Sequence, residues 1–150
     1  MNSDKVPGRS SVSRAARFSS AYSYARANAS ATENAELYGR WSAVDGLGCN
    51  FRIECTFEGD IDPLTGMVAN LIDIDSWMSA AVNVFDHRDL TQLQVVNRHG
   101  AATADAIAAA FEEVLVAAMP PQADGVRLTR LRLWEGDSSC VDRARREWIK

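Results

Sequence analysis

Apolar and polar residues alternate along two long stretches of the chain. In residues 49–59, "CNFRIECTFEG", every second position is apolar, and these positions are Phe51, Ile53, Cys55 and Phe57. Because successive side chains of a strand point to opposite faces, this pattern predicts a strand with one buried face. Residues 126–136, "VRLTRLRLWEG", predict a second strand, and the change of phase at Thr129 and Arg130 predicts either a bulge or a register with mixed faces. A shorter alternation in residues 17–24, "RFSSAYSY", predicts a third strand.

Two other stretches repeat apolar residues every three or four positions, which is the period of a helix. The first set is Leu71, Ile74, Met78, Ala81 and Phe85. The second set is Ile107, Phe111, Leu115 and Ala118. We expect this second helix to begin at Thr103 or Asp105 and to end before Pro120 and Pro121, because proline cannot continue a helix.

The order of these elements indicates the fold class. Residues 25–46 have no clear period, so we expect a long loop there, with a short helical turn near "TENAELYG". The elements then run strand, loop, strand, helix, helix, strand. This order predicts an α+β domain, in which two helices pack on one face of an antiparallel sheet. Oligomerisation is one way to cover the edges of so small a sheet.

The two ends of the chain are polar. Residues 1–16 lack a hydrophobic signal core, and we expect a disordered lead-in before a single domain over residues 17–150. The last ten residues, "VDRARREWIK", form a basic tail that includes Arg143, Arg145 and Arg146. We expect a solvated last helix there, with a face for a partner as the alternative.

Composition excludes several classes of function. A length of 150 residues suits one domain, and a net charge of −4 argues against general binding to nucleic acid. No apolar run approaches the roughly 20 residues that span a bilayer, so we expect a cytoplasmic protein with no membrane partner. Three cysteines and two histidines make neither a disulfide framework nor a conventional structural zinc site.

Two polar groups stand next to apolar positions and are candidates for chemistry. In "FDHRDL", Asp86 and His87 follow the first helix. They are either a proton-transfer pair or the polar end of a helix, where a histidine interacts well with the dipole. Glu135 ends the last strand, on the face of Leu131 and Leu133. It is either an anchor for a ligand or a solvated strand end.

Several motifs in this order resemble a known family. "GDIDP" and "TGMV" precede the first helix, "FDHRDL" follows it, and the last strand ends in "WEG". Over about residues 17–140 the chain resembles the 6-pyruvoyl-tetrahydropterin synthase and 6-carboxy-tetrahydropterin synthase family. The resemblance implies a tunnelling fold, in which subunits join their sheets into a trimeric barrel and trimers often stack into hexamers. It also implies active sites between subunits.

The resemblance fails at the residues that bind zinc in that family. Its three zinc-binding histidines come from F-S-A-x-H and G-H-G-H-N-Y patterns. Here these stretches read "FSSAY" and "GLGCNF", which places Tyr22, Leu47 and Cys49 at the three positions. The catalytic cysteine of an F-G-K-C-N pattern corresponds to Trp41 in "YGRWS". We therefore expect no metal and no other cofactor.

Other positions keep the family's pattern. Asp86 and His87 match its Asp–His pair, which assists proton transfer, and Glu135 matches the glutamate that grips the pyrimidine edge of the pterin. Asp105, in "TAD", stands where the family has a Thr-x-Glu pattern. The resemblance thus implies His87, Asp86 and Glu135 as catalytic residues. The residues expected to line the substrate are Tyr22, Trp41, Leu47, Cys49 and Asp105.

Three hypotheses follow for the function. The first is a metal-free enzyme that uses acid–base chemistry on a small organic molecule, by proton abstraction, dehydration, isomerisation or ring closure, in specialised-metabolite biosynthesis. Here Tyr22 donates a hydrogen bond to a developing oxyanion, and Trp41 and Leu47 make the pocket drier. The second is a non-catalytic binding or assembly protein of the same fold. The third, a standard zinc-dependent pterin synthase, conflicts with the lost ligands. We expect a homo-oligomer in each case.

Overall fold

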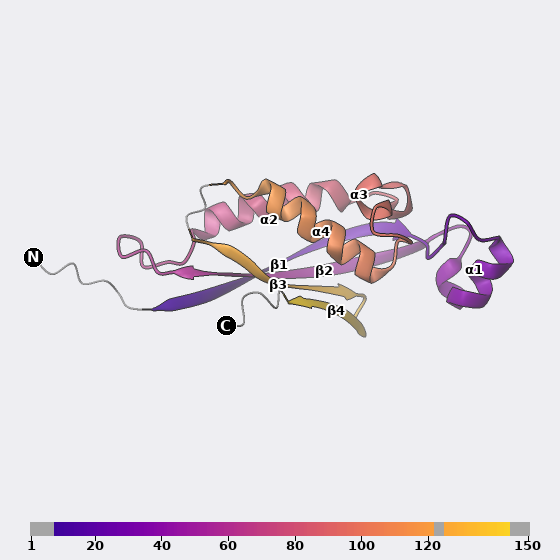
Figure 1. Cartoon of the computed structure of the whole chain (residues 1–150), viewed down its shortest axis with the longest axis horizontal. Helices are drawn as coiled ribbons and strands as arrows, with labels where there is room; N and C mark the ends of the chain where they lie inside the picture. The colour runs from indigo at the N-terminus through magenta and orange to yellow at the C-terminus, as the bar shows by residue number, and fades with distance from the viewer. Residues whose placement is uncertain (1–7, 122–124, 145–150) are drawn as a thin grey trace, which may run out of the picture.

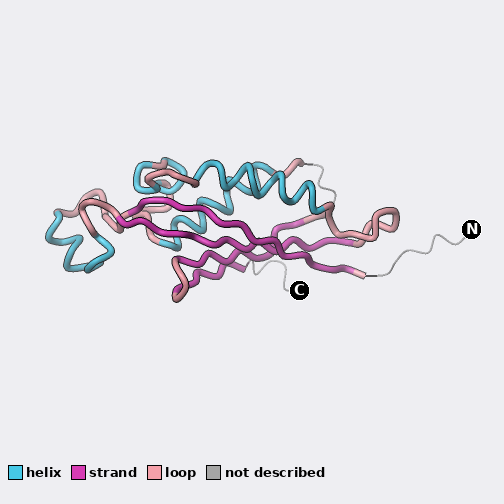
Figure 2. Tube along the Cα trace, turned by 180° about the vertical axis from the view of Figure 1, so that it is seen from behind, coloured by secondary structure: helices cyan, strands magenta, loops and turns pink. Residues whose placement is uncertain are grey.

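A computed structural model shows a four-stranded antiparallel sheet with helices on one face, and it describes residues 8–121 and 125–144. The strands lie in the order β1 (Arg9–Tyr22), β2 (Leu47–Asp60), β3 (Arg127–Glu135) and β4 (Ser139–Ala144). The helices that cover the sheet are α2 (Leu71–Phe85) and α4 (Ala104–Ala118) (Figure 1). The predicted α+β arrangement is confirmed. Seen from behind, both helices lie on the same side of the strands (Figure 2).

The alternation of β2 places its apolar residues in the core. Phe51 pairs with Phe18 of β1 and lies fully buried. The register between β2 and β3 shifts at Thr56 and Phe57, because Thr56 pairs with Arg130 and Phe57 pairs with Leu128. Residue 129 is left without a partner in the ladder, so of the two predicted alternatives the bulge is confirmed.

Both core helices begin at a polar side chain that caps them. The Asn70 side chain accepts a hydrogen bond from the backbone N–H of Ile72 (3.1 Å), and Thr103 accepts one from Ala106 (3.3 Å). These bonds satisfy amides that have no partner within the helix. The buried faces of α2 and α4 meet the sheet in an aromatic cluster of Phe18, Phe51, Phe85 and Phe111.

The remaining connections form short helices. The loop between β1 and β2 contains α1 (Ala31–Tyr38), which has a capping box of Ser30 and Glu33, and η1 (Gly39–Ser42). Figure 1 shows α1 beyond one end of the sheet. The expected helical turn is thus a helix of eight residues. After α2 come η2 (Leu90–Gln92) and α3 (Gln94–Asn97).

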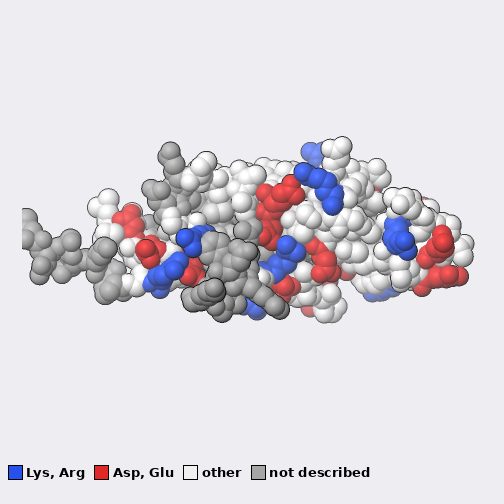
Figure 3. All heavy atoms as spheres, viewed as in Figure 1, with Lys and Arg blue, Asp and Glu red and all other residues white. Residues whose placement is uncertain are grey.

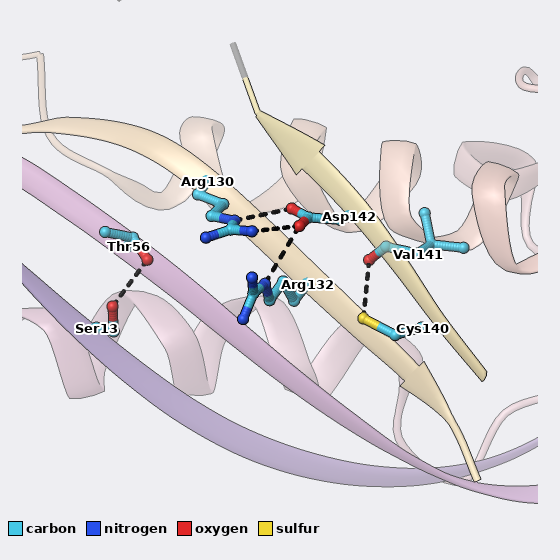
Figure 4. Close-up of polar contacts among 7 residues, drawn as sticks. All are labelled: Ser13, Thr56, Arg130, Arg132, Cys140, Val141 and Asp142. Carbon is cyan, nitrogen blue, oxygen red and sulfur yellow. Dashed lines mark hydrogen bonds and ion pairs between the residues drawn. The ribbon is translucent and has the colours of Figure 1, made fainter. Parts of the chain in front are cut away.

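Two expectations for the ends of the chain are wrong. β1 begins at Arg9, so the second half of the expected lead-in is part of the sheet. The strand ends at Tyr22 rather than at residue 24. Residues expected in a last helix instead form β4, which pairs with β3 along its length. Asp142 of β4 accepts hydrogen bonds from Arg130 and Arg132 of β3, and these bonds favour the strand (Figure 4). Residues 1–7 and 145–150 lie outside the described residues.

The face of the sheet opposite the helices, here called the open face, carries polar side chains. Ser13 of β1 bonds Thr56 of β2 (2.8 Å), next to the contacts of Asp142 (Figure 4). Acidic and basic side chains are interspersed over the surface seen in Figure 3. In the described ranges, no helix has both the length and the apolar character needed to cross a bilayer.

Candidate functional site

Asp86 and His87 point toward one another at the end of α2. One carboxylate oxygen of Asp86 accepts a hydrogen bond from the backbone N–H of Ser19 (2.9 Å), and the other lies 2.9 Å from His87 Nδ1. The hydrogen bond from the Ser19 N–H holds the pKa of Asp86 below its usual value, and the contact with the imidazole adds a smaller effect in the same direction. The carboxylate is therefore charged near neutral pH and fixes the proton of the neutral imidazole on Nδ1. This leaves His87 Nε2 free to accept a proton.

The backbone around His87 is fastened to the edge of β1. The His87 N–H donates to the carbonyl of Ser19 (2.7 Å), and the Ala21 N–H donates to the carbonyl of Arg88 (2.9 Å). His87 has a φ of 55°, in the left-handed region that residues other than glycine seldom adopt. Such a residue commonly follows the end of a helix. These contacts hold the imidazole in one place while leaving its side chain 83% exposed.

The imidazole borders a hollow of about 590 Å³ at the end of the sheet. The residues that line it are Ser19, Ser20, Ala21, Gly48, Cys49, Asn50, His87, Arg88 and Asp89. The hollow is open to solvent and large enough for a small organic molecule. An exposed imidazole oriented by a charged carboxylate beside such a hollow can act as a general base or acid.

Glu135 lies on the face of the sheet that the helices cover, in a buried group with two tyrosines. Only 7% of Glu135 is exposed, and its Oε2 accepts a hydrogen bond from the Tyr24 hydroxyl (2.9 Å). The Tyr24 oxygen also accepts the backbone N–H of Ala104, at the start of α4 (3.2 Å). Tyr22 is 1% exposed, and its hydroxyl interacts with Glu135 and Cys49. Glu135 is thus held from two sides.

Burial keeps both tyrosines protonated. Loss of solvent raises the pKa of Tyr22 and of Tyr24 well above the usual value, and the negative charge of Glu135 adds to this effect. Burial also raises the pKa of the Cys49 thiol. The two phenols therefore act as hydrogen-bond donors, and the thiol is a neutral group that lines the site.

The other residues expected around the substrate lie near these tyrosines. Trp41, in η1, packs against Tyr24 with ring centres 5.6 Å apart, and lies 6.5 Å from the ring of Tyr22. Leu47 is half-buried and packs against the core. Asp105 is exposed in the first turn of α4, where its charge acts on Tyr24.

The expected site residues thus form two groups within one chain. In the part of the chain that is described, no hydrogen bond or ion pair joins His87 to Glu135. Cys49 connects the groups, because it borders the hollow beside His87 and interacts with Tyr22. Tyr24, which holds Glu135, was not among the residues expected at the site. Its signal in the sequence was the second aromatic residue of "YSY", two positions after the last residue of β1.

The residues expected at the three zinc positions do not fit a zinc ion. Leu47 has no donor atom, and burial opposes the loss of a proton from both Tyr22 and Cys49. Among the described residues, no three histidine, cysteine or acidic side chains are grouped so that they could hold a metal.

Comparison with known proteins identifies the family. Residues 11–146 match the family described as 6-pyruvoyl tetrahydropterin synthase. The chain belongs to this family. The 6-pyruvoyl tetrahydrobiopterin synthase of Pongo abelii is 32% identical over 131 residues, which are 87% of this chain and 88% of that protein. The Homo sapiens protein of the same description is 38% identical over 80 residues, or 53% of this chain and 55% of that protein.

A solved structure extends the likeness to the fold. The 6-pyruvoyl tetrahydropterin synthase of Caenorhabditis elegans superposes with a TM-score of 0.83 at 23% identity, covering 92% of this chain and 96% of that one. The predicted tunnelling fold of the single chain is confirmed.

Proposed function

We propose that this family member is a metal-independent acid–base catalyst that acts on a small organic molecule. The observation that carries the proposal is the Asp86–His87 pair, fixed to β1 by Ser19 and exposed beside a hollow. An imidazole in this position can exchange protons with a molecule in the hollow. The residues at the zinc positions support a mechanism without metal, because their donors are absent or kept protonated.

In this mechanism each residue has a distinct task. His87 Nε2 takes a proton from carbon or oxygen of the substrate and returns it elsewhere on the molecule. Asp86 stabilises the imidazolium that forms and keeps the ring oriented. Proton transfer by a positioned side chain such as His87 is typically worth about 10²- to 10⁴-fold in rate. Such a proton shift serves dehydration, isomerisation or ring closure, and biosynthesis of a specialised metabolite is a suitable setting.

Glu135 and the tyrosines form the polar wall on the other side of Cys49. The Tyr22 hydroxyl interacts with Glu135, so we assign it to holding this carboxylate rather than to the expected oxyanion contact. Trp41 and Leu47 exclude water around the tyrosines, and this strengthens their hydrogen bonds. Glu135 then offers its remaining acceptor capacity to a polar group of the substrate.

Proton exchange in heavy water tests the proposal. Chelator-treated protein is incubated in deuterium oxide with a panel of pterins and small carbonyl compounds, and mass spectrometry follows deuterium incorporation. We expect exchange into at least one compound and a rate lowered about 100-fold or more by His87→Asn. Elemental analysis of protein purified without chelator should show far less than one metal ion per subunit.

The other histidine supplies a matched control. His99 contacts Glu113 (3.1 Å) and does not line the hollow, so His99→Asn should leave the rate unchanged. Circular dichroism should show both variants folded. Equal rates for wild type and His87→Asn, or a stoichiometric metal whose removal stops the exchange, would contradict the proposal.

A second candidate is a binding protein without catalysis. It is favoured by the Tyr24 hydroxyl, which already satisfies Glu135 within the chain. In that case a compound from the panel binds equally well to wild type and to His87→Asn, and neither protein exchanges its protons.

A further inference from the structure

A groove with an apolar lining, here called the apolar groove, lies at the end of the sheet where β1 begins. The bulky residues that line it are Val12, Ile61, Met67, Val68 and Leu71. They come from β1 and from the segment that leads from β2 into α2, at the end of the sheet opposite α1 (Figure 1). The groove has a volume of about 230 Å³, which is below the roughly 300–1,000 Å³ of most small-molecule pockets. A large side chain of a protein therefore fits it better than a substrate does.

The residues next to the apolar groove are apolar and exposed as well. Leu64, in the same loop, is 91% exposed, and Ile72, which follows Leu71, is 76% exposed. Met67 and Leu71 are themselves exposed. Exposed apolar residues that gather in one place commonly mark a surface to which another protein segment binds. The apolar groove and its surroundings thus have the character of a docking surface.

The segment that forms most of the apolar groove carries negative charge. Residues 58–75 contain five acidic residues and no basic residue. Arg9 and Arg14 of β1 neutralise part of this charge by ion pairs. Asp62 and Asp73 form no ion pair with any residue that the structure describes. Charge complementarity therefore favours a partner segment that combines basic residues with a bulky apolar side chain.

Residues 145–150, "RREWIK", have this combination. They follow β4 and lie outside the described residues. They contain three basic residues and one acidic residue, together with Trp148 and Ile149. Tryptophan is enriched among the side chains that anchor protein interfaces by filling a pocket. Residues 1–7 adjoin the start of β1, but they contain one lysine, one aspartate and no aromatic residue, so they match the apolar groove less well.

The direction of the strands brings residues 145–150 of a second copy to the apolar groove. β1 and β4 are the two edges of the sheet, and β4 runs antiparallel to β1, toward the end where β1 begins (Figure 1). If β4 of one copy lies along the β1 edge of the next, the residues after β4 run past Ser10 and Ser11, which also line the groove. Within one chain the same residues start three strands away from β1, at about 14 Å. The path from a second copy is therefore the shorter one.

We infer that the apolar groove binds residues 145–150 of a second copy of this chain. Trp148 fills the space beside Val12 and Leu71, and the basic residues of the segment face Asp62 and Asp73. The contact lies at the opposite end of β1 from the Asp86–His87 pair. It therefore does not depend on the proposed function, and either can fail without the other.

Photo-crosslinking from position 148 of the whole protein tests the inference. Trp148→p-benzoylphenylalanine places a photoreactive ketone in the segment, and illumination joins it to a group that it touches. A denaturing gel then separates a product of two chains, at about twice the subunit mass of 16.4 kDa, from a product within one chain. We expect the two-chain product, with its cross-link located by mass spectrometry in residues 10–12 or 61–72.

Three changes, each added to the photoreactive protein, test the contribution of the apolar groove. Leu71→Ser removes an exposed apolar side chain from the groove and should lower the yield of the two-chain product about fivefold or more. Asp73→Lys reverses a charge that faces the segment and should lower it as well. Val84→Ser is the matched control, because Val84 is a comparably exposed residue of the same helix that does not line the groove. It should leave the yield unchanged, and circular dichroism should show all three proteins folded.

A product within one chain would assign the apolar groove to residues 145–150 of the same subunit. A two-chain product that is joined elsewhere would place the segment on another surface. Either result would overturn the inference, as would the absence of any product or equal yields from Leu71→Ser and Val84→Ser.

Discussion

At the scale of single residues, Tyr24 connects parts of the chain that are far apart in sequence. Its hydroxyl donates to Glu135 at the end of β3 and accepts from the amide of Ala104 at the start of α4. One oxygen atom therefore satisfies a buried carboxylate and one of the helix amides that lack a partner within the helix. Tyr24 thus fixes both the position of Glu135 and the beginning of α4.

Tyr24→Phe should lower the free energy of unfolding by about 1–3 kcal/mol, because it removes one hydrogen bond from the buried Glu135 carboxylate and leaves the Ala104 amide without one. Urea unfolding followed by circular dichroism measures the change. Tyr38→Phe is a matched control. Tyr38 packs edge-on against the ring of Tyr24, but no described group bonds its hydroxyl, so its loss should cost less than about 0.5 kcal/mol. Equal effects of the two changes would contradict the role of Tyr24.

Residues of the candidate site could be predicted from the sequence only where a local pattern marks them. Asp86 and His87 are adjacent, and Glu135 ends a strand whose phase places it with Leu133. The contact of Tyr24 with Glu135 spans 111 residues, and no local period encodes it.

At the scale of elements, the strands and helices that bury only one face were predicted from the sequence. β2, α2 and α4 each bury a regular apolar face, and their periods predicted them. The first half of β1 is rich in serine and arginine and is largely exposed on both faces, so it showed no such period. In β4, Arg143 and Ala144 suit a helix by intrinsic preference, but pairing with β3 determined the outcome.

Asp86 joins the end of α2 to β1, and this link should depend on pH. The folded protein holds the pKa of Asp86 below its value in the unfolded chain. The charged carboxylate therefore stabilises the fold fully above the unfolded value, and this stabilisation is lost as the pH falls through the folded value. Asp86→Asn has no such proton to bind.

The difference in free energy of unfolding between wild type and Asp86→Asn should therefore be constant near neutral pH and shrink below about pH 5. Urea unfolding of both proteins across pH 2–7 measures this difference. A gap that stays constant into the acid range would mean that the bond from Ser19 does not depend on the charge of Asp86.

At the scale of the whole molecule, β1 and β4 are the edges of the sheet. The N–H and C=O groups of Ser19 and the N–H of Ala21 point away from β2, because they bond the segment after α2. By alternation, the backbone of Ala15 points the same way, and no described strand pairs with it there. We propose that this edge joins neighbouring subunits into the expected trimer or hexamer.

Ala15→Pro should dissociate the assembly while leaving the subunit folded. Proline removes the outward N–H of this position but keeps the ladder between β1 and β2. Sedimentation velocity should show a species near the subunit mass of 16.4 kDa for the variant and a multiple of it for wild type. Ala15→Val keeps the N–H and should sediment as wild type does. A wild-type monomer, or an Ala15→Pro variant that stays assembled, would contradict the proposal.

The fastening of residues 86–88 to β1 also sets how far a second subunit can extend along this edge. Those residues occupy the main chain at Ser19 and Ala21, so pairing with a neighbour must stop near Arg17. The stretch from Arg9 to Arg17 leaves a seam of about 30 Å. The segment that carries His87 thus ends the stretch of β1 that can pair with a neighbour. It also places the imidazole and Arg17 together at the end of the seam. A neighbouring subunit would complete the wall of the hollow beside His87 at that point, so assembly and activity should be lost together.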